Sequence, residues 1–184
     1  MSFKQMVTDM RALGDNGAYI GRLCPPHLGH LYLADLLLEA FPSTHMIGIG
    51  SCNEKLSFKH LFNYGDKRDV LRLLYPQATI LPVPDFGNDE LWFAALDDQL
   101  RAMGRNVKDT VFIGGCEEEV EFYYKAGRKV FIVNRFGGLT TKVSGTEVRD
   151  ALIERRSLDG MLHPSTIPLV QERFALRWEE FRSK

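Results

Sequence analysis

Cysteine is scarce in this chain of 184 residues, and the three cysteines that it has lie far apart. Cys24, Cys52 and Cys116 form no CxxC pair, which argues against a zinc ribbon, a redox motif and a disulfide framework. Free thiols are the simplest interpretation of such a set. They predict a reducing compartment, and hence a cytoplasmic location.

The sequence also has no excess of either charge and no long apolar run. The formal net charge is −1 and the isoelectric point is near 6.5, which disfavours a broad surface for nucleic acid. The longest apolar stretch, at 31–41, contains Asp35 and Glu39 and falls short of the ~20 residues that a membrane span needs. Residues 1–17 carry charges throughout, so we expect neither a signal peptide nor membrane association. Chemistry on phosphates would have to use a few placed cations.

What the chain does have is enough apolar material for a core. Hydrophobic residues make up 45% of it and charged residues 26%, which is the balance of a globular protein. The length fits one domain over residues 1–184, with residues 1–17 as a helical extension. No disulfide or structural metal is needed to stabilise a core of this size, and we expect no protein-bound metal. The sequence leaves a homo-oligomer open.

Short apolar segments alternate with helical ones along the chain. We expect strands at 18–23, 44–50, 78–83, 110–113 and 129–133, and helices at 2–13, 28–41, 66–74, 89–103, 117–125, 145–154 and 167–182. This alternation predicts an α/β fold, a parallel sheet with helices on both faces. Ligands of such sheets bind beyond the carboxyl ends of the strands, where the strand order reverses. The long connections at 51–64 and 134–143 are predicted loops, and the first could act as a lid.

The first chemical motif lies where the first strand passes into a helix, in the segment GRLCPPHLGHL at 21–31. His27 and His30 are three residues apart at the helix start, so both rings can face one cleft and donate N–H bonds to phosphate oxygens. Gly29 lets a ligand approach the backbone closely. The alternatives are capping or packed rings, and a metal site, for which the neighbourhood lacks further ligands.

The second motif is SGTEVR at 144–149. Ser144 and Glu147 have the spacing of a capping box, which explains these two residues structurally. It leaves Thr146 and Arg149 unexplained. A hydroxyl and a guanidinium at a helix N-terminus can receive a phosphate.

Together, HLGH at 27–30 and SGTEVR at 144–149 resemble the HxGH nucleotidyltransferase superfamily, and most closely the archaeal-type nicotinamide mononucleotide adenylyltransferases. The segments IGIGS at 47–51 and FNYGDKR at 62–68 also resemble that branch, the latter with one residue more before its arginine. The pair Asp85 and Trp92 resembles its aspartate-to-tryptophan segment. The resemblance covers about residues 18–174 and implies a five-stranded Rossmann-like core.

The resemblance implies transfer of AMP from ATP, with Mg²⁺, to nicotinamide mononucleotide, which gives NAD and pyrophosphate. It assigns catalysis to His27, His30 and Arg149, and places the pyridine mononucleotide against Asp85 and Trp92. The residues that it implies for ATP binding are Gly21, Arg22, Leu23, Gly29, Ser144 and Thr146. For Trp92, packing in the core is an equally good interpretation.

Several departures leave the acceptor open. Leu28 stands where a basic residue is common, Asp89 where asparagine is frequent, and Lys142 where archaeal-type members carry other residues. Nicotinic acid mononucleotide and phosphopantetheine are alternative acceptors, and a non-catalytic nucleotide-binding regulator is an alternative from another class. Cytidylyl transfer is less expected from SGTEVR. We interpret the acidic run at 117–119 as a solvated helix start and Lys59 as a solvated lysine that could reach a phosphate.

Overall fold

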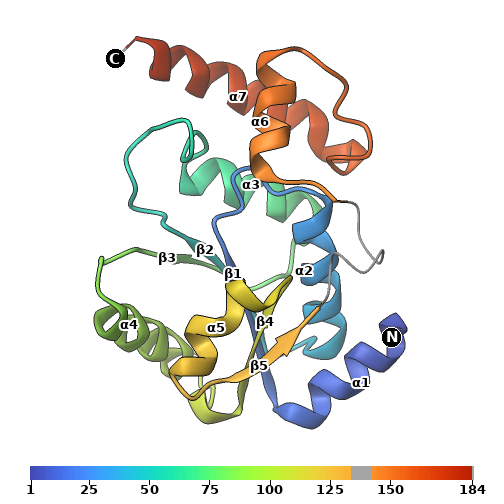
Figure 1. Ribbon diagram of the computed structural model, residues 1–184, viewed down its shortest axis with the longest axis vertical. Helices are drawn as coiled ribbons and strands as arrows, with labels where there is room; N and C mark the ends of the chain where they lie inside the picture. Colours follow the sequence, from blue (N-terminus) through green and yellow to red (C-terminus); the bar gives the residue numbers. More distant parts are fainter. Residues whose placement is uncertain (134–141, 184) are drawn as a thin grey trace.

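A computed structural model describes residues 1–133 and 142–183 of the chain. Its centre is a parallel sheet of five strands in the order β3-β2-β1-β4-β5 (Figure 1). The strands are β1 Asn16–Gly21, β2 His45–Gly50, β3 Ile80–Val83, β4 Thr110–Gly114 and β5 Lys129–Ile132. Consecutive strands extend the sheet from β1 in one direction and from β4 in the other, so the order reverses between β1 and β4. The predicted α/β fold is confirmed.

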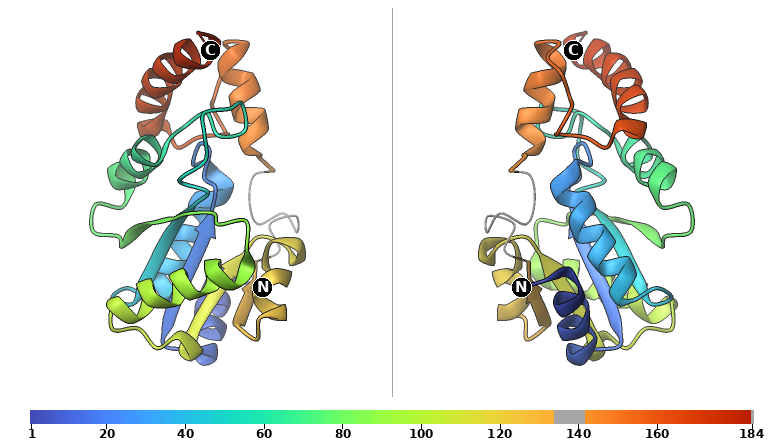
Figure 2. Two further views of the ribbon diagram at one scale, coloured as in Figure 1. Left: turned by 90° about the vertical axis from the view of Figure 1, so that its left-hand side faces the viewer. Right: turned by 90° about the vertical axis from the view of Figure 1, so that its right-hand side faces the viewer.

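Helices cover both faces of this sheet. They are α1 Phe3–Leu13, α2 Leu28–Ala40, α3 Tyr64–Leu74, α4 Asp89–Ala102, α5 Glu117–Lys125, α6 Gly145–Ile153 and α7 Ile167–Arg182, with short 3-10 turns at Val107–Asp109 and Pro164–Thr166. In Figure 2, α1 and α2 lie on one face of the sheet and α4 and α5 on the other. None of the helices in the described ranges is long and apolar enough to cross a membrane.

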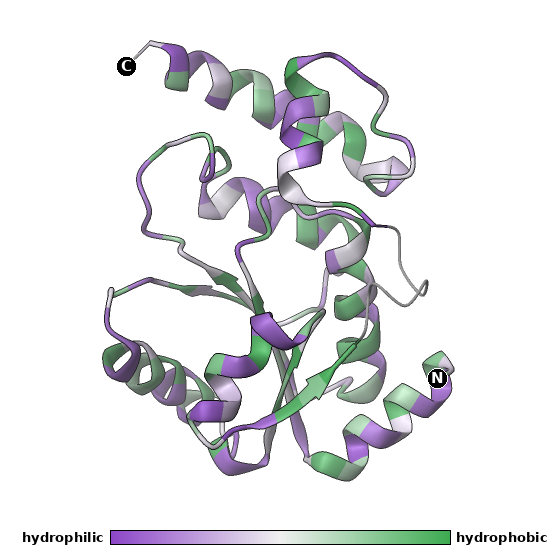
Figure 3. Cartoon of the chain, viewed as in Figure 1, coloured by the Kyte–Doolittle hydropathy of each residue, from purple (hydrophilic) through white to green (hydrophobic). Residues whose placement is uncertain are grey.

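The alternation of side chains along each strand builds two separate cores. Tyr19 and Ile113 point to the face where α1 and α2 pack, whereas Ala18 and Phe112 point to the face of α4 and α5. This is the two-residue period of a strand buried on both sides. α2 is hydrophobic along most of its length (Figure 3), as its sequence predicts, because it lies between the sheet and α1.

A third core lies beyond the carboxyl ends of the strands. It joins α3 to α6 and α7 through buried side chains, among them Phe62, Val70, Val148, Val170 and Phe174. Figure 1 shows α6 and α7 above the sheet rather than against either face. The second sequence motif, SGTEVR, is therefore carried by a helix layer that sits over the end of the sheet.

Residues 1–17 have a structural explanation. Met6, Val7 and Met10 of α1 are buried in the core shared with α2. The guanidinium of Arg11 donates from Nε to the carbonyl oxygen of Ala40 at 2.9 Å and from Nη2 to that of Glu39 at 2.6 Å. These are carbonyls in the last turn of α2, which have no partner within the helix, so α1 caps α2.

Several predicted boundaries differ by two residues, among them both ends of β1 and the start of β3, and two of the differences have local reasons. β1 begins at Asn16 rather than residue 18, because Gly17 belongs to the strand: a Cβ atom there would lie 2.2 Å from the ring of Phe41. α3 begins at Tyr64 rather than residue 66, because Asn63 and Asp66 form a capping box, with Asp66 N–H donating to Asn63 Oδ1 at 2.9 Å. Of the predicted loop at 134–143, residues 134–141 lie outside the described residues.

Candidate active site

A cleft of about 930 Å³ opens at the carboxyl ends of β1 and β2. It lies beside the reversal of strand order between β1 and β4, where parallel α/β sheets bind their ligands. The structure brings both sequence motifs to this cleft, although more than a hundred residues separate them. Of the predicted residues, Gly21, Arg22, Leu23, His27, His30, Trp92, Ser144, Thr146 and Arg149 line it.

The two histidines lie face to face at the start of α2. Their ring centroids are 3.6 Å apart with an angle of 28° between the planes, and both rings line the cleft. His27 is the N-cap residue of α2, and its backbone N–H donates to Nδ1 of His30 at 3.3 Å. The capping interpretation and the phosphate-binding interpretation are thus compatible, since the contact that fixes the rings also aims them at one cavity.

The turn between β1 and α2 is locked to the start of α6. Leu23 is buried in a left-handed conformation with φ of 51°, which costs a non-glycine residue about 1–3 kcal/mol and needs support from its surroundings. Arg149 supplies it by donating from Nη1 to the carbonyl oxygen of Cys24 at 2.5 Å. Gly145 permits the approach, because a Cβ atom there would lie 2.8 Å from the same oxygen.

Arg149 is a buried cation with few neighbours to balance it. It is 6% exposed, donates from Nη2 to Thr146 Oγ1 at 3.0 Å, and lies with its guanidinium carbon 4.9 Å from the ring centre of Phe58. Burial lowers the pKa of its guanidinium, and the charge of Arg22 lowers it further. An anion in the cleft would relieve both effects, because it restores favourable surroundings to a charge that has lost its water.

Ser144 acts first as a helix cap. Its Oγ accepts from Glu147 N–H at 3.2 Å, and its own N–H donates to Glu147 Oε2 at 2.6 Å. The pKa of Glu147 is lowered by these bonds to Ser144. The predicted capping box is present. It directs the N-terminus of α6, with the exposed hydroxyl of Thr146, toward the cleft.

The other end of the cleft is aromatic. Trp92 lines it together with Phe122, and their ring centroids are 5.0 Å apart in an edge-to-face contact. Trp92 also packs edge-to-face on Phe93 at 5.2 Å. The half-buried Trp92 therefore belongs to the core on one side and to the cleft on the other, so both interpretations of this residue apply.

Two predicted residues lie elsewhere. Asp85 does not line the cleft: its carboxylate accepts from Gly87 N–H at 3.0 Å, and its backbone N–H and carbonyl pair with the side chain of Asn53 at 2.7 Å each. Asp85 thus holds the loop after β3 against the segment after β2. Gly29 is buried in the first turn of α2 and is not part of the lining either.

Comparison with known proteins places this geometry in a family. The profile described as cytidylyltransferase-like matches residues 18–151, which include the whole sheet except the first two residues of β1. The chain belongs to this family. It is also similar, at 24% identity over 84% of its length and 86% of the relative's, to a protein of Methanospirillum hungatei named nicotinamide-nucleotide adenylyltransferase. A protein of Thermococcus sibiricus with the same name is 23% identical over 85% of this chain and 83% of its own.

A solved structure shares the fold of the present chain, with a TM-score of 0.71 at 18% sequence identity. It is a bifunctional NMN adenylyltransferase/ADP ribose pyrophosphatase from Francisella tularensis, complexed with AMP and a manganese ion. The match covers 91% of this chain and 52% of that one, so the present chain spans about half of its length. The likeness confirms the Rossmann-like architecture expected from the two motifs.

The cleft is also lined by residues that the sequence analysis did not assign to the site. Phe58 and Lys59, from the segment after β2, line it, and so does Glu119 of α5. Phe58 and Lys59 belong to a long irregular segment and Glu119 to the first turn of α5, so no motif marks them in the sequence. The direction of a side chain in an irregular segment is set by tertiary packing, and no periodicity encodes it.

The segment FNYGDKR contains one exposed and one buried cation. Arg68 is exposed and pairs with Asp69 at 2.9 Å, whereas Lys67 is buried at 2% exposure. Burial lowers the pKa of Lys67, and the charge of Arg22 acts in the same direction. The buried cation of this segment is therefore Lys67 rather than Arg68, the residue that matches the arginine of the family's motif.

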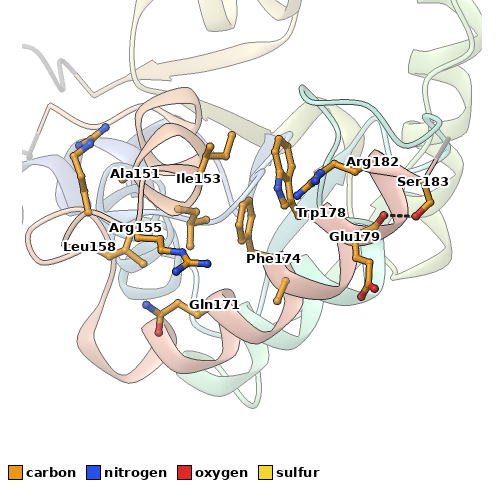
Figure 4. Close-up of a pocket in the computed structure, with 13 residues that line it drawn as sticks. Ala151, Ile153, Arg155, Leu158, Gln171, Phe174, Trp178, Glu179, Arg182 and Ser183 are labelled. Carbon is orange, nitrogen blue, oxygen red and sulfur yellow. Dashed lines mark hydrogen bonds between the residues drawn. The ribbon is translucent and has the colours of Figure 1, made fainter.

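A second hollow, of about 1140 Å³, lies between α6 and α7. Figure 4 shows Phe174 and Trp178 side by side in it, with Arg155 and Arg182 at its edges. It contains none of the predicted site residues. Both sequence motifs meet instead in the smaller cleft.

Proposed function

We propose that this chain transfers AMP from ATP to nicotinamide mononucleotide, producing NAD and pyrophosphate. The observation that carries the proposal is the meeting of the stacked pair His27 and His30 with Arg149 across one cleft at the reversal of the sheet. The names of the archaeal relatives support the same reaction. The aromatic end of the cleft supports a flat, cationic acceptor ring.

The proposed step is a displacement at phosphorus. An oxygen of the acceptor's 5′-phosphate forms a bond to the α-phosphorus of ATP, and the bond from that phosphorus to the bridging oxygen breaks, so pyrophosphate leaves with the electron pair. No proton has to move and no covalent enzyme intermediate forms. Catalysis then consists of alignment and stabilisation of negative charge by groups already in place.

The residues of the basic end have complementary roles in this proposal. His27, His30 and Arg22 bind the triphosphate from the side of α2. Arg149 and Thr146, with the N-terminus of α6 that Ser144 caps, bind its β and γ phosphates from the other side. Gly21, Leu23 and Gly29 give the turn the shape that lets the nucleotide approach. Lys59, from the segment after β2, adds a further cation to the cleft.

At the acceptor end, Trp92 would stack on the pyridine ring. Asp85 would act through its loop, because Asn53 joins that loop to the segment after β2, which lines the cleft. We propose no direct contact between the Asp85 carboxylate and the acceptor.

The metal in this reaction is written as part of the substrate, MgATP. The described portions of the chain contain no group of three His, Cys, Asp or Glu side chains that could hold a metal ion. Mg²⁺ keeps much of its water and binds mainly through phosphate oxygens, so it would need few ligands from the protein. Bound there, the ion would neutralise charge on the leaving pyrophosphate.

We also propose that residues 1–184 act as one nucleotidyltransferase unit on small molecules rather than nucleic acids, in a reducing, cytoplasmic location. The three cysteines, all free thiols in the structure, support the reducing compartment. The contacts of α1 with the C-terminus of α2 support a purely structural role for residues 1–17.

Pyrophosphate release tests the proposal. Purified protein with Mg²⁺ and either ATP or CTP is offered nicotinamide mononucleotide, nicotinic acid mononucleotide or phosphopantetheine. We expect turnover with ATP and a pyridine mononucleotide, and a loss of about 10²–10³-fold in His30→Ala, the size typical of one lost charge-stabilising donor. The control His163→Ala changes a histidine outside the cleft, at the start of the Pro164–Thr166 turn, and should keep its rate.

Three results would contradict the proposal. Turnover with CTP alone would assign cytidylyl transfer. Turnover with phosphopantetheine alone would assign another acceptor. Thermal stabilisation by ATP without turnover on any acceptor would indicate a non-catalytic nucleotide-binding regulator.

A further inference from the structure

The segment between β2 and α3 contributes an aromatic ring to the wall of the cleft that α6 forms. Phe58 lies in this segment, lines the cleft and is half-buried. Its ring centre is 4.9 Å from the guanidinium carbon of Arg149, which belongs to α6. One wall of the cleft therefore places the face of a ring against a charge that another wall carries.

Local hydrogen bonds hold this ring in place. The aromatic residue lies inside a short turn, which is closed by His60 N–H donating to the carbonyl oxygen of Ser57 at 3.0 Å and to its Oγ at 3.2 Å. Just after the turn, the buried Phe62 donates from its backbone N–H to Cys24 Sγ at 3.5 Å. Cys24 is also the residue whose carbonyl oxygen accepts from Arg149. The ring and the guanidinium are thus anchored to the same residue, which fixes their separation.

Arg149 has donors to spare for a ligand. An arginine side chain carries five N–H groups. One on Nη1 binds the carbonyl oxygen of Cys24, and one on Nη2 binds Thr146 Oγ1. Within residues 1–133 and 142–183, the other three N–H groups, including that of Nε, have no acceptor. Because these three donors belong to a residue that lines the cleft, they are available to phosphate oxygens.

We propose that Phe58 is a positioning residue for adenylyl transfer, acting through Arg149; this inference rests on the proposed function. The negative face of its ring attracts the guanidinium and holds it against the wall of the cleft. The remaining N–H groups then stay aligned with the phosphates while negative charge moves onto pyrophosphate. Without the ring, an arginine side chain free to change rotamer has to be ordered in each turnover, which raises the barrier.

Two substitutions of Phe58 separate the aromatic face from its bulk. Phe58→Tyr keeps the ring, whereas Phe58→Leu keeps an apolar side chain without one. We expect kcat/KM for ATP to fall about tenfold in Phe58→Leu, the size of a partly desolvated contact between a cation and a ring. In Phe58→Tyr it should stay near that of the wild type. Equal losses in the two variants would contradict the proposal.

Fluorinated phenylalanines at position 58 test the charge of the ring directly. Successive fluorine atoms withdraw electrons from the ring face and change its size little, so the packing stays while the attraction for a cation fades. We expect kcat/KM for ATP to fall stepwise from phenylalanine to pentafluorophenylalanine. The same series at Phe93 is the control, because Arg128 lies over that ring at 5.1 Å and neither residue lines the cleft. There kcat/KM for ATP should not change.

A double-mutant cycle tests whether Arg149 is the partner of the ring. In an Arg149→Met background, Phe58→Leu should lower kcat/KM for ATP much less than in the wild type, because the ring has no cation to hold. An equal loss in both backgrounds, or no trend with fluorine, would overturn the proposal while the proposed reaction stands. Wild-type protein that releases no pyrophosphate with ATP and either pyridine mononucleotide would instead overturn the proposed function, and this inference with it.

Discussion

Arg149 joins the two halves of the candidate site through its hydrogen bonds to Cys24 and Thr146. A lysine keeps the charge but cannot form the planar fork that reaches both oxygens. We expect Arg149→Lys to lower kcat for pyrophosphate release by about 10²–10³-fold. It should also lower the free energy of unfolding by about 1–3 kcal/mol, because a buried carbonyl loses its donor.

Chemical denaturation and pyrophosphate release on the same preparations check this expectation. Arg156→Lys is the control, since Arg156 lies close by, is exposed, and pairs with Glu154 on the surface. Equal losses in the two variants would show that the contact with Cys24 has no special weight.

At the scale of single residues, sequence reasoning identifies groups whose role depends on local spacing. His27, His30, Ser144 and Arg149 all follow from short motifs, and all line the cleft. Glu119 and Lys59 carry no such spacing, and Asp85 has its carboxylate turned to Gly87 by a local hydrogen bond. Charge type and position in the sequence alone could not tell which of these three faces the ligand.

Among the elements, α1 offers a sharp test of a structural role. Arg11 donates two hydrogen bonds to the last turn of α2 but lies far from the cleft lining. Arg11→Ala should therefore lower the free energy of unfolding by about 1–2 kcal/mol, the range for a charged donor that is partly solvated. Its kcat and KM should stay those of the wild type.

Lys4→Ala is the matched control for this test, because Lys4 is an exposed cation on the same helix. Thermal and urea denaturation measure the stabilities. A loss of activity in Arg11→Ala at a temperature where the protein stays folded would contradict a purely structural role for α1.

Most helices and strands are predictable here because each segment has a hydrophobic pattern that fits only one kind of element. The strands are short apolar runs and α2 is apolar on most sides, since both are covered from two directions. Boundaries were missed where tertiary contact decides, as at Gly17, which is small because Phe41 packs on it. The strand order is a further property that alternation leaves undetermined, because it depends on which crossover folds to which side.

For the molecule as a whole, α6 is attached to the sheet's end through the core that it shares with α3 and α7. Asp66 of α3 is 3% exposed and accepts from Arg177 of α7, at 2.7 Å from Nε and 3.3 Å from Nη2. Removing one partner of a buried ion pair costs about 3–5 kcal/mol. We expect Asp66→Asn to lower the free energy of unfolding by about 3 kcal/mol, the lower end of this range, because Arg177 is partly solvated.

Asp66→Asn should also raise the KM for ATP, because α6 carries Thr146 and Arg149 on the same layer. The control is Glu180→Gln, which removes the exposed partner of the same arginine. Initial rates over a range of ATP concentrations provide the readout. An unchanged KM for ATP in Asp66→Asn would show that the helix layer keeps its position without this ion pair.

The bond between Arg149 and the Cys24 carbonyl spans 125 positions of the chain. During synthesis, the histidine pair leaves the ribosome long before the guanidinium that faces it. A chain interrupted before residue 142 would have all five strands but would lack the side of the cleft that α6 supplies. The candidate site would then be complete only once the last part of the protein has emerged.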